Sequence, residues 1–123
     1  RVGRLVFWSP GVLITDRQLL RVGDLAVVGM GARIGAHTML RGSDGRIELL
    51  LAPVVIGERA QVGGYSSLGP GACVEAGETL PPTLVLHPFS TWRRGRRQRN
   101  TAPVDVEPST AGRWPPAARD DSP

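Results

Sequence analysis

An aliphatic residue followed by glycine recurs every six residues along two stretches of the chain. The pairs are Val22-Gly23, Val28-Gly29, Ile34-Gly35, Ile56-Gly57, Val62-Gly63 and Leu68-Gly69, and the series continues without glycine at Leu40, Val74, Leu80 and Leu86. A period of six matches neither the 3.6 residues of an α-helix turn nor the alternation of an ordinary strand. It is typical of a parallel β-solenoid built from hexapeptide units.

The fourth residue after each aliphatic position is usually small. These residues are Ala26, Ala32, Thr38, Ala60, Ser66 and Ala72, and the rule breaks at Glu78 and Leu84. We expect the aliphatic side chain to point into a narrow interior and the small one to pack near a corner. Three units make a triangular coil of 18 residues, and each coil buries its apolar column only by stacking on the next.

Counting inward positions predicts five coils over residues 1–91. Val2 to Val22 is a coil with two extra residues, and Val22 to Leu40 is a regular one. Leu40 to Ile56 has only 16 residues, which indicates a rearranged corner near the Asp44-Gly45 turn. Two regular coils follow from Ile56. The expected fold class is therefore all-β, a hexapeptide-repeat parallel β-helix of about five coils.

The pattern stops after residue 91, and the composition changes. Residues 92–123 carry five arginines between Arg93 and Arg99 and then several prolines. Such a segment buries too little apolar area to offset its ordering entropy, so it is expected to be a disordered tail. The basic run has three interpretations: a solvated linker, contact with an anionic membrane surface with Trp92 at the interface, or contact with phosphate groups.

Charge and composition narrow the function classes. The net charge of +4 comes from 15 arginines against 11 acidic residues, but residues 1–91 hold 8 arginines against 7 acids. A basic body that binds nucleic acid is therefore not expected. The single cysteine, Cys73, excludes an internal disulfide or a multi-cysteine zinc site and is interpreted as a half-buried structural thiol. No apolar run approaches the roughly 18 residues of a membrane helix, and the absence of an initiator methionine suggests a fragment.

The six-residue pattern resembles the left-handed β-helix of hexapeptide-repeat acyltransferases. The order of landmarks is similar to the C-terminal region of nonribosomal-peptide-synthetase-like proteins of the epsilon-poly-lysine synthetase type. Those landmarks are VGRLVF at 2–7, LITDRQLLRVGD at 13–24, the SDG turn at 43–45, VVIGERAQVG at 54–63 and GETLPP at 77–82. The resemblance implies acyl or aminoacyl transfer to an amine, with a phosphopantetheine thioester or coenzyme A as donor.

The resemblance also implies partners. Adenylation and carrier domains would lie upstream, and the domain would form a homo-oligomer, a trimer in most hexapeptide transferases, or stack on a tandem repeat. The location would be cytoplasmic, or membrane-associated through the parent protein. Two alternatives stay open: a catalytically silent scaffold for carrier docking or oligomerisation, and a truncated coenzyme-A-dependent acetyltransferase.

Candidate site residues gather around the stretch 33–45. Members of the family commonly carry a histidine just before the acidic-glycine turn, where this chain has Arg41 or Gly42. His37 is expected to face outward, either as an ordinary surface residue or as the candidate general base. In the second case Asp44 is expected to orient its ring. Arg41 would pair with Asp44 or hold a phosphate of the substrate. The other histidine, His87, is expected to cap or pack the last coil, and no metal site is expected from two distant histidines.

Overall fold

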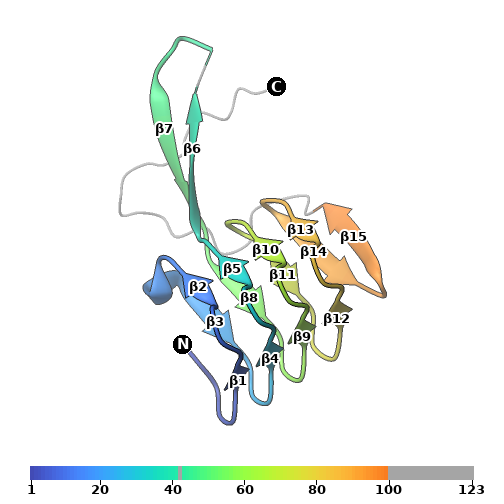
Figure 1. Ribbon diagram of the computed structural model, residues 1–123. Coiled ribbons are helices and arrows are strands. Elements are labelled where there is room, and N and C mark those ends of the chain that lie inside the picture. Colours follow the sequence, from blue (N-terminus) through green and yellow to red (C-terminus); the bar gives the residue numbers. More distant parts are fainter. Residues whose placement is uncertain (42, 100–123) are drawn as a thin grey trace.

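The computed structural model describes residues 1–41 and 43–99, which form a parallel β-helix (Figure 1). Its strands are β1 (Phe7–Trp8), β2 (Leu13–Ile14), β3 (Leu20–Val22), β4 (Val27–Val28), β5 (Arg33–Ile34), β6 (His37–Arg41), β7 (Ile47–Leu51), β8 (Val54–Ile56), β9 (Gln61–Val62), β10 (Ser67–Leu68), β11 (Cys73–Val74), β12 (Thr79–Leu80), β13 (Val85–Leu86), β14 (Ser90–Arg93) and β15 (Arg96–Arg99). The one helical turn among these residues is the 3-10 helix η1 (Arg17–Leu19). The predicted fold class is confirmed.

Three parallel sheets form the sides of the triangular solenoid. Their strand orders are β1-β4-β9-β12, β2-β5-β10-β13 and β3-β8-β11-β14, with β15 added to the end of the third sheet. A fourth sheet is the antiparallel pair β6-β7, which projects from the coil stack as a separate ribbon (Figure 1).

The register of the third sheet counts the coils. Val2 bridges to Val22, Val22 pairs with Ile56, Ile56 with Val74 and Val74 with Trp92. The chain thus returns to this column four times, and the described solenoid has four coils. The prediction of about five was wrong because the interval from Leu40 to Ile56 is not a coil.

The second coil explains the difference. Val22 and Ile56 are 34 residues apart in sequence, which is 16 more than the 18 of a regular coil. The excess is taken up by the β6–β7 ribbon, in which Leu40 pairs with Glu48 and Thr38 with Leu50. Leu40 and Thr38 match the hexapeptide pattern in sequence, yet their backbone has left the coil.

The interior confirms the predicted roles of the repeat positions. The inward residues Val28, Ile56, Val74, Leu80 and Leu86 are fully buried. The small corner residues Ala26, Ala32, Ala60, Ser66 and Ala72 are also fully buried. The hydroxyl of Ser66 donates to the carbonyl of Pro81 at 2.9 Å, which satisfies the polar group inside the core. Burial of each large aliphatic side chain is worth about 1.5–3 kcal/mol.

The predicted domain boundary at residue 91 was wrong. β14 continues the third sheet through Trp92, which is 8% exposed, and β15 folds back on it as an antiparallel hairpin. The turn is held by Glu78, whose carboxylate accepts from the backbone nitrogens of Arg94 at 3.0 Å and Gly95 at 3.2 Å. This explains why an acidic residue replaces the small one at 78. The expected disorder of 100–123 lies outside the described residues.

Arg93 anchors the same hairpin to the turn that follows β11. Its guanidinium donates from Nε at 2.7 Å and from Nη2 at 2.5 Å to Oε2 of Glu75. Trp92 is buried and so does not take the exposed place that one of the three interpretations of the basic run gave it, whereas the arginines of β15 are exposed. No helix within residues 1–41 and 43–99 has the length and apolar character needed to cross a membrane.

Candidate functional site

His37 forms a close pair with Asp16 at one corner of the solenoid. Nδ1 of the imidazole lies 2.5 Å from Oδ2 of the carboxylate. The side chain of His37 is 42% exposed and that of Asp16 17% exposed, so the pair is reachable from solvent on the histidine side. As predicted, His37 faces outward.

Two departures from the regular repeat bring these residues together. Ile14 of β2 pairs with Ile34 of β5, and each of these two strands is followed by an enlarged corner. In the first coil, which has 20 residues, the corner is η1 with Asp16 before it. In the second coil the corner is the β6–β7 ribbon, which begins at His37. The two insertions stack on each other because their coils are neighbours.

Asp16 is held in place by its own local contacts. Its backbone is left-handed, with φ 56° and ψ 54°, which short polar residues tolerate better than most. Its Oδ2 accepts from the hydroxyl of Thr15 at 2.9 Å and from the backbone nitrogen of Ala36 at 3.2 Å. Burial raises the pKa of Asp16, but the hydrogen bonds from His37, Thr15 and Ala36 outweigh it, so the pKa lies below its usual value.

The ionised Asp16 decides the tautomer of His37. A carboxylate can only accept, so Nδ1 of the imidazole carries the proton. Nε2 of the neutral ring then has a free lone pair. A histidine oriented through Nδ1 by a fixed carboxylate is the arrangement of a general base.

Asp44 does not orient His37, contrary to the sequence-based expectation. It lies at the tip of the ribbon, beyond the last pair of the ladder, Arg41 with Ile47. Four residues of strand, about 13 Å, separate that pair from His37. Asp44 instead accepts from the backbone nitrogen of Arg46 at 3.0 Å, and its carboxylate lies 4.0 Å from the guanidinium of Arg46.

Arg41 also takes a different partner from the one expected. Its Nη1 donates to the carbonyl oxygen of Gly45 at 3.2 Å. This hydrogen bond links the end of β6 to the turn at the tip of the ribbon. The guanidinium near the carboxylate of Asp44 is that of Arg46. Arg41 therefore lies at the far end of the ribbon from His37 and has a role in the turn.

One face of the ribbon carries apolar side chains between His37 and Arg41. Opposed residues of an antiparallel pair share a face, and the register places His37 opposite Leu51, Met39 opposite Leu49 and Arg41 opposite Ile47. Met39 is 64% exposed, Ile47 59% and Leu49 42%. These three apolar side chains therefore form an exposed strip along the ribbon.

The remaining candidates lie apart from this corner. His87 follows β13 and is exposed, so of the predicted capping and packing roles only the packing role is contradicted. Cys73 of β11 is partly buried, as predicted, and burial together with the nearby Glu75 raises the pKa of its thiol. Within the described residues, no three His, Cys, Asp or Glu side chains are grouped so as to hold a metal ion.

The sequence analysis did not predict the pairing of Asp16 with His37. The available signal was the two-residue excess of the first coil, which falls on the segment Thr15-Asp16-Arg17. An acidic residue in an enlarged corner next to the coil that carries His37 could have been proposed as its partner, had the register of the second coil been known.

Comparisons with known proteins agree with the architecture. No protein-family model and no curated protein sequence matches the chain. Among solved structures, the chain is similar to a hexapeptide-repeat-containing acetyltransferase from Vibrio cholerae O1 biovar eltor in complex with acetyl-coenzyme A, with a TM-score of 0.58 and 18% identity. The match covers 83% of this chain and 60% of that one. The likeness establishes the fold, and the chain is a hexapeptide-repeat parallel β-helix.

Proposed function

We propose that this domain is an acyltransferase that moves an acyl group from a thioester to an amine, with His37 as general base. The observation that carries the proposal is the 2.5 Å contact between Nδ1 of His37 and Oδ2 of Asp16. Support comes from the fold, which is shared with an acetyltransferase that binds acetyl-coenzyme A. The pair lies where two neighbouring coils are enlarged. These longer corners provide room for a site that a regular coil lacks.

The proposed reaction begins with proton removal by the base. Nε2 of His37 takes a proton from the attacking amine while the nitrogen of the amine bonds to the carbonyl carbon of the thioester. The tetrahedral intermediate then breaks the carbon–sulfur bond and forms the amide. The imidazolium returns the proton to the departing thiolate, and Asp16 stabilises the transient charge on the ring through Nδ1.

The donor is proposed in two forms that share one reactive group. Coenzyme A and a carrier-bound phosphopantetheine both present a thioester at the end of the same arm. Within a nonribosomal-peptide-synthetase-like parent, upstream adenylation and carrier domains would supply an aminoacyl thioester. A stand-alone acetyltransferase would take acetyl-coenzyme A.

A second copy of the domain, or a tandem repeat, is proposed to complete the site. His37 is open on one side, and the apolar strip of Met39, Leu49 and Ile47 beside it is exposed. Acyl transfer also needs a donor for the developing oxyanion and exclusion of water. A Met39→Glu, Leu49→Glu variant should then be smaller by light scattering than the wild type and less active. Equal mass and equal activity would contradict the association.

The test of the reaction is amide formation from acetyl-coenzyme A and from an aminoacyl-pantetheine thioester, each with a panel of primary amines. His37→Ala should lower kcat/KM by about 100-fold or more, as expected when a general base is removed. His87→Ala is the matched control, since it deletes the other histidine, which is exposed and far along the chain. An unchanged rate in His37→Ala would exclude its role as base.

The second candidate function is a silent scaffold that docks a carrier domain. It is favoured because this chain has Arg41 or Gly42 in place of the histidine that family members commonly carry before the acidic-glycine turn. Turnover by neither donor in the wild type, together with measurable binding of a carrier domain, would select it. Turnover with only one of the two donors separates the synthetase-like role from the acetyltransferase.

A further inference from the structure

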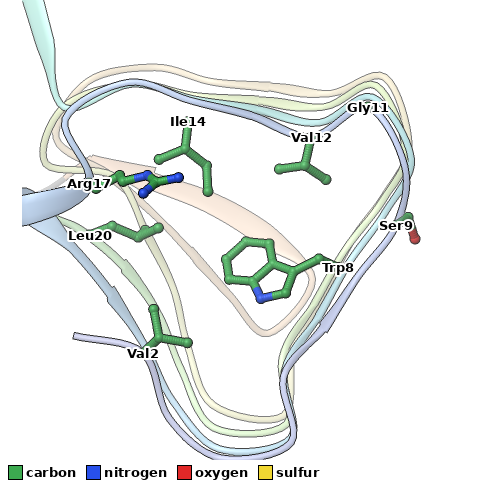
Figure 2. Close-up of a pocket in the computed structure, with 8 residues that line it drawn as sticks. All are labelled: Val2, Trp8, Ser9, Gly11, Val12, Ile14, Arg17 and Leu20. Carbon is green, nitrogen blue, oxygen red and sulfur yellow. The ribbon is translucent and has the colours of Figure 1, made fainter.

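Within the described residues, the first coil borders an open hollow on the side away from the second coil. The hollow has a volume of about 460 Å³, and Val2, Trp8, Val12, Ile14, Arg17 and Leu20 contribute to its walls. Figure 2 looks along the coil stack and shows the indole of Trp8 crossing the interior and the side chains of Val12 and Ile14 pointing into it. The opposite end differs, because β15 pairs along the last strand of the third sheet there.

The side chains of the first coil are larger than their counterparts in the next coil. Trp8 pairs with Val28, and the residues before β1 and β2, Val6 and Val12, align with Ala26 and Ala32. Inner coils carry small residues at these corners because another coil packs directly against them. A bulkier corner leaves less room for such stacking. The first coil therefore offers more aromatic and aliphatic surface to a ligand than the corresponding corners of the second coil.

The charged group that lines the hollow is the guanidinium of Arg17. Arg17 begins η1 in the enlarged corner of the first coil, and Figure 2 shows its side chain extending toward Ile14 and Leu20. Among residues 1–41 and 43–99, its guanidinium has neither a hydrogen-bond acceptor nor an ion-pair partner. The neighbouring carboxylate of Asp16 is engaged with His37. The hollow thus offers a cation at the rim and aromatic and aliphatic walls inside.

We infer that this hollow binds a small amphipathic carboxylate. The apolar body of the ligand would lie against Trp8, Val12 and Ile14, and its carboxylate would pair with Arg17. The volume falls within the range of about 300–1,000 Å³ of small-molecule sites, and a guanidinium suits a carboxylate because it donates two parallel hydrogen bonds. The site is separate from the acyl-transfer chemistry proposed for His37 and does not depend on it.

Titration of the 123-residue chain with sodium octanoate, followed by calorimetry, tests the inference. Saturable binding with a dissociation constant below about 1 mM is expected. Octan-1-ol, which keeps the chain and lacks the charge, should bind at least tenfold more weakly. The nuclear magnetic resonance signal of the Trp8 indole should shift during the octanoate titration, which locates the ligand.

Variants then separate charge from shape. Arg17→Gln should weaken octanoate at least tenfold and leave octan-1-ol unchanged, and Arg17→Lys should lose less. Arg33→Gln is the matched control, because Arg33 is exposed on β5 and does not line the hollow. All variants change exposed side chains, and circular dichroism confirms the fold. Absence of saturable binding, equal affinity for octanol, or no effect of Arg17→Gln would each overturn the inference.

Discussion

The imidazole of His37 and the carboxylate of Asp16 lie 2.5 Å apart although 21 residues separate them in the chain. The contact forms because the first and second coils enlarge at the same corner. Asp16 immediately precedes η1 in the first coil. His37 is the first residue of β6, where the chain leaves the second coil. The relationship therefore depends on stacking between two coils and on two irregular corners of unequal length.

Acid titration should reveal the Asp16 contacts. The pKa of Asp16 is lowered in the folded protein, since its hydrogen bonds outweigh the opposing effect of burial. The carboxylate therefore adds stability that is present above the unfolded pKa of about 3.9 and is lost as pH falls through the lower folded value. Asp16→Asn should be less stable than wild type at pH 7, and this difference should shrink below about pH 4.

Urea unfolding at pH 7 and pH 3 measures that difference. Glu75, whose pKa is also lowered by its hydrogen bond from Arg93, adds the same slope to both proteins and so cancels in the comparison. A stability gap that stays constant with pH would contradict a role of the Asp16 charge.

The ribbon should be removable without loss of the solenoid. Deletion of residues 37–52 shortens the 34-residue interval from Val22 to Ile56 to 18, the length of a regular coil. Ala36 and Ala52 already lie side by side, with the nitrogen of Ala52 donating to the carbonyl of Ala36 at 3.0 Å. We expect retention of the β-rich circular dichroism spectrum and loss of acyl transfer. Collapse of the spectrum would show that the ribbon stabilises the coils.

Gly63 should tolerate no side chain. A Cβ there would meet the backbone of Pro82 and Leu80 in the next coil, inside van der Waals contact. Gly63→Ala should destabilise the fold by about 1–3 kcal/mol, the cost of overpacking against backbone that cannot yield. Gly45→Ala at the ribbon tip is the control. Its φ of 85° makes alanine strained, but nothing lies within 4 Å of the added carbon.

Thermal unfolding of both glycine variants distinguishes crowding from backbone strain. A clearly larger loss in Gly63→Ala than in Gly45→Ala would assign the extra cost to the stacking of coils. Equal losses at the two positions would contradict the crowding argument, because Gly45→Ala meets only the backbone strain of its positive φ.

Trp92 should stabilise the last coil through its volume and not through its indole nitrogen. It is 8% exposed, and its buried Nε1 has no hydrogen-bond partner in the described part of the chain. Trp92→Ala should cost about 3–5 kcal/mol, as for other large-to-small core changes. Trp92→Phe should cost clearly less, because it keeps an aromatic ring and removes an unsatisfied polar group. Equal costs in chemical unfolding would indicate a hidden hydrogen bond of the indole.

Much of the interior could be predicted from local pattern. The inward positions Val28 and Val62 and the corner positions Ala26 and Ala60 follow from a repeat that has the same meaning in every regular coil. The errors fell where the repeat is interrupted. Leu40 fits the six-residue count but lies in the ribbon, and Trp92 lies beyond the last recognisable unit but belongs to the same column as Val74.

The sequence by itself determined the solenoid, because each hexapeptide unit encodes its own strand, corner and inward side chain. Only the tertiary structure decided which irregular segments meet. A hairpin and a two-residue enlargement leave no periodic signal, and their placement depends on which coils pair across the sheet. Because of that pairing, the partner of His37 is Asp16, one coil away, and not Asp44, which is closer in sequence. The fold also places Arg17 beside the hollow of the first coil.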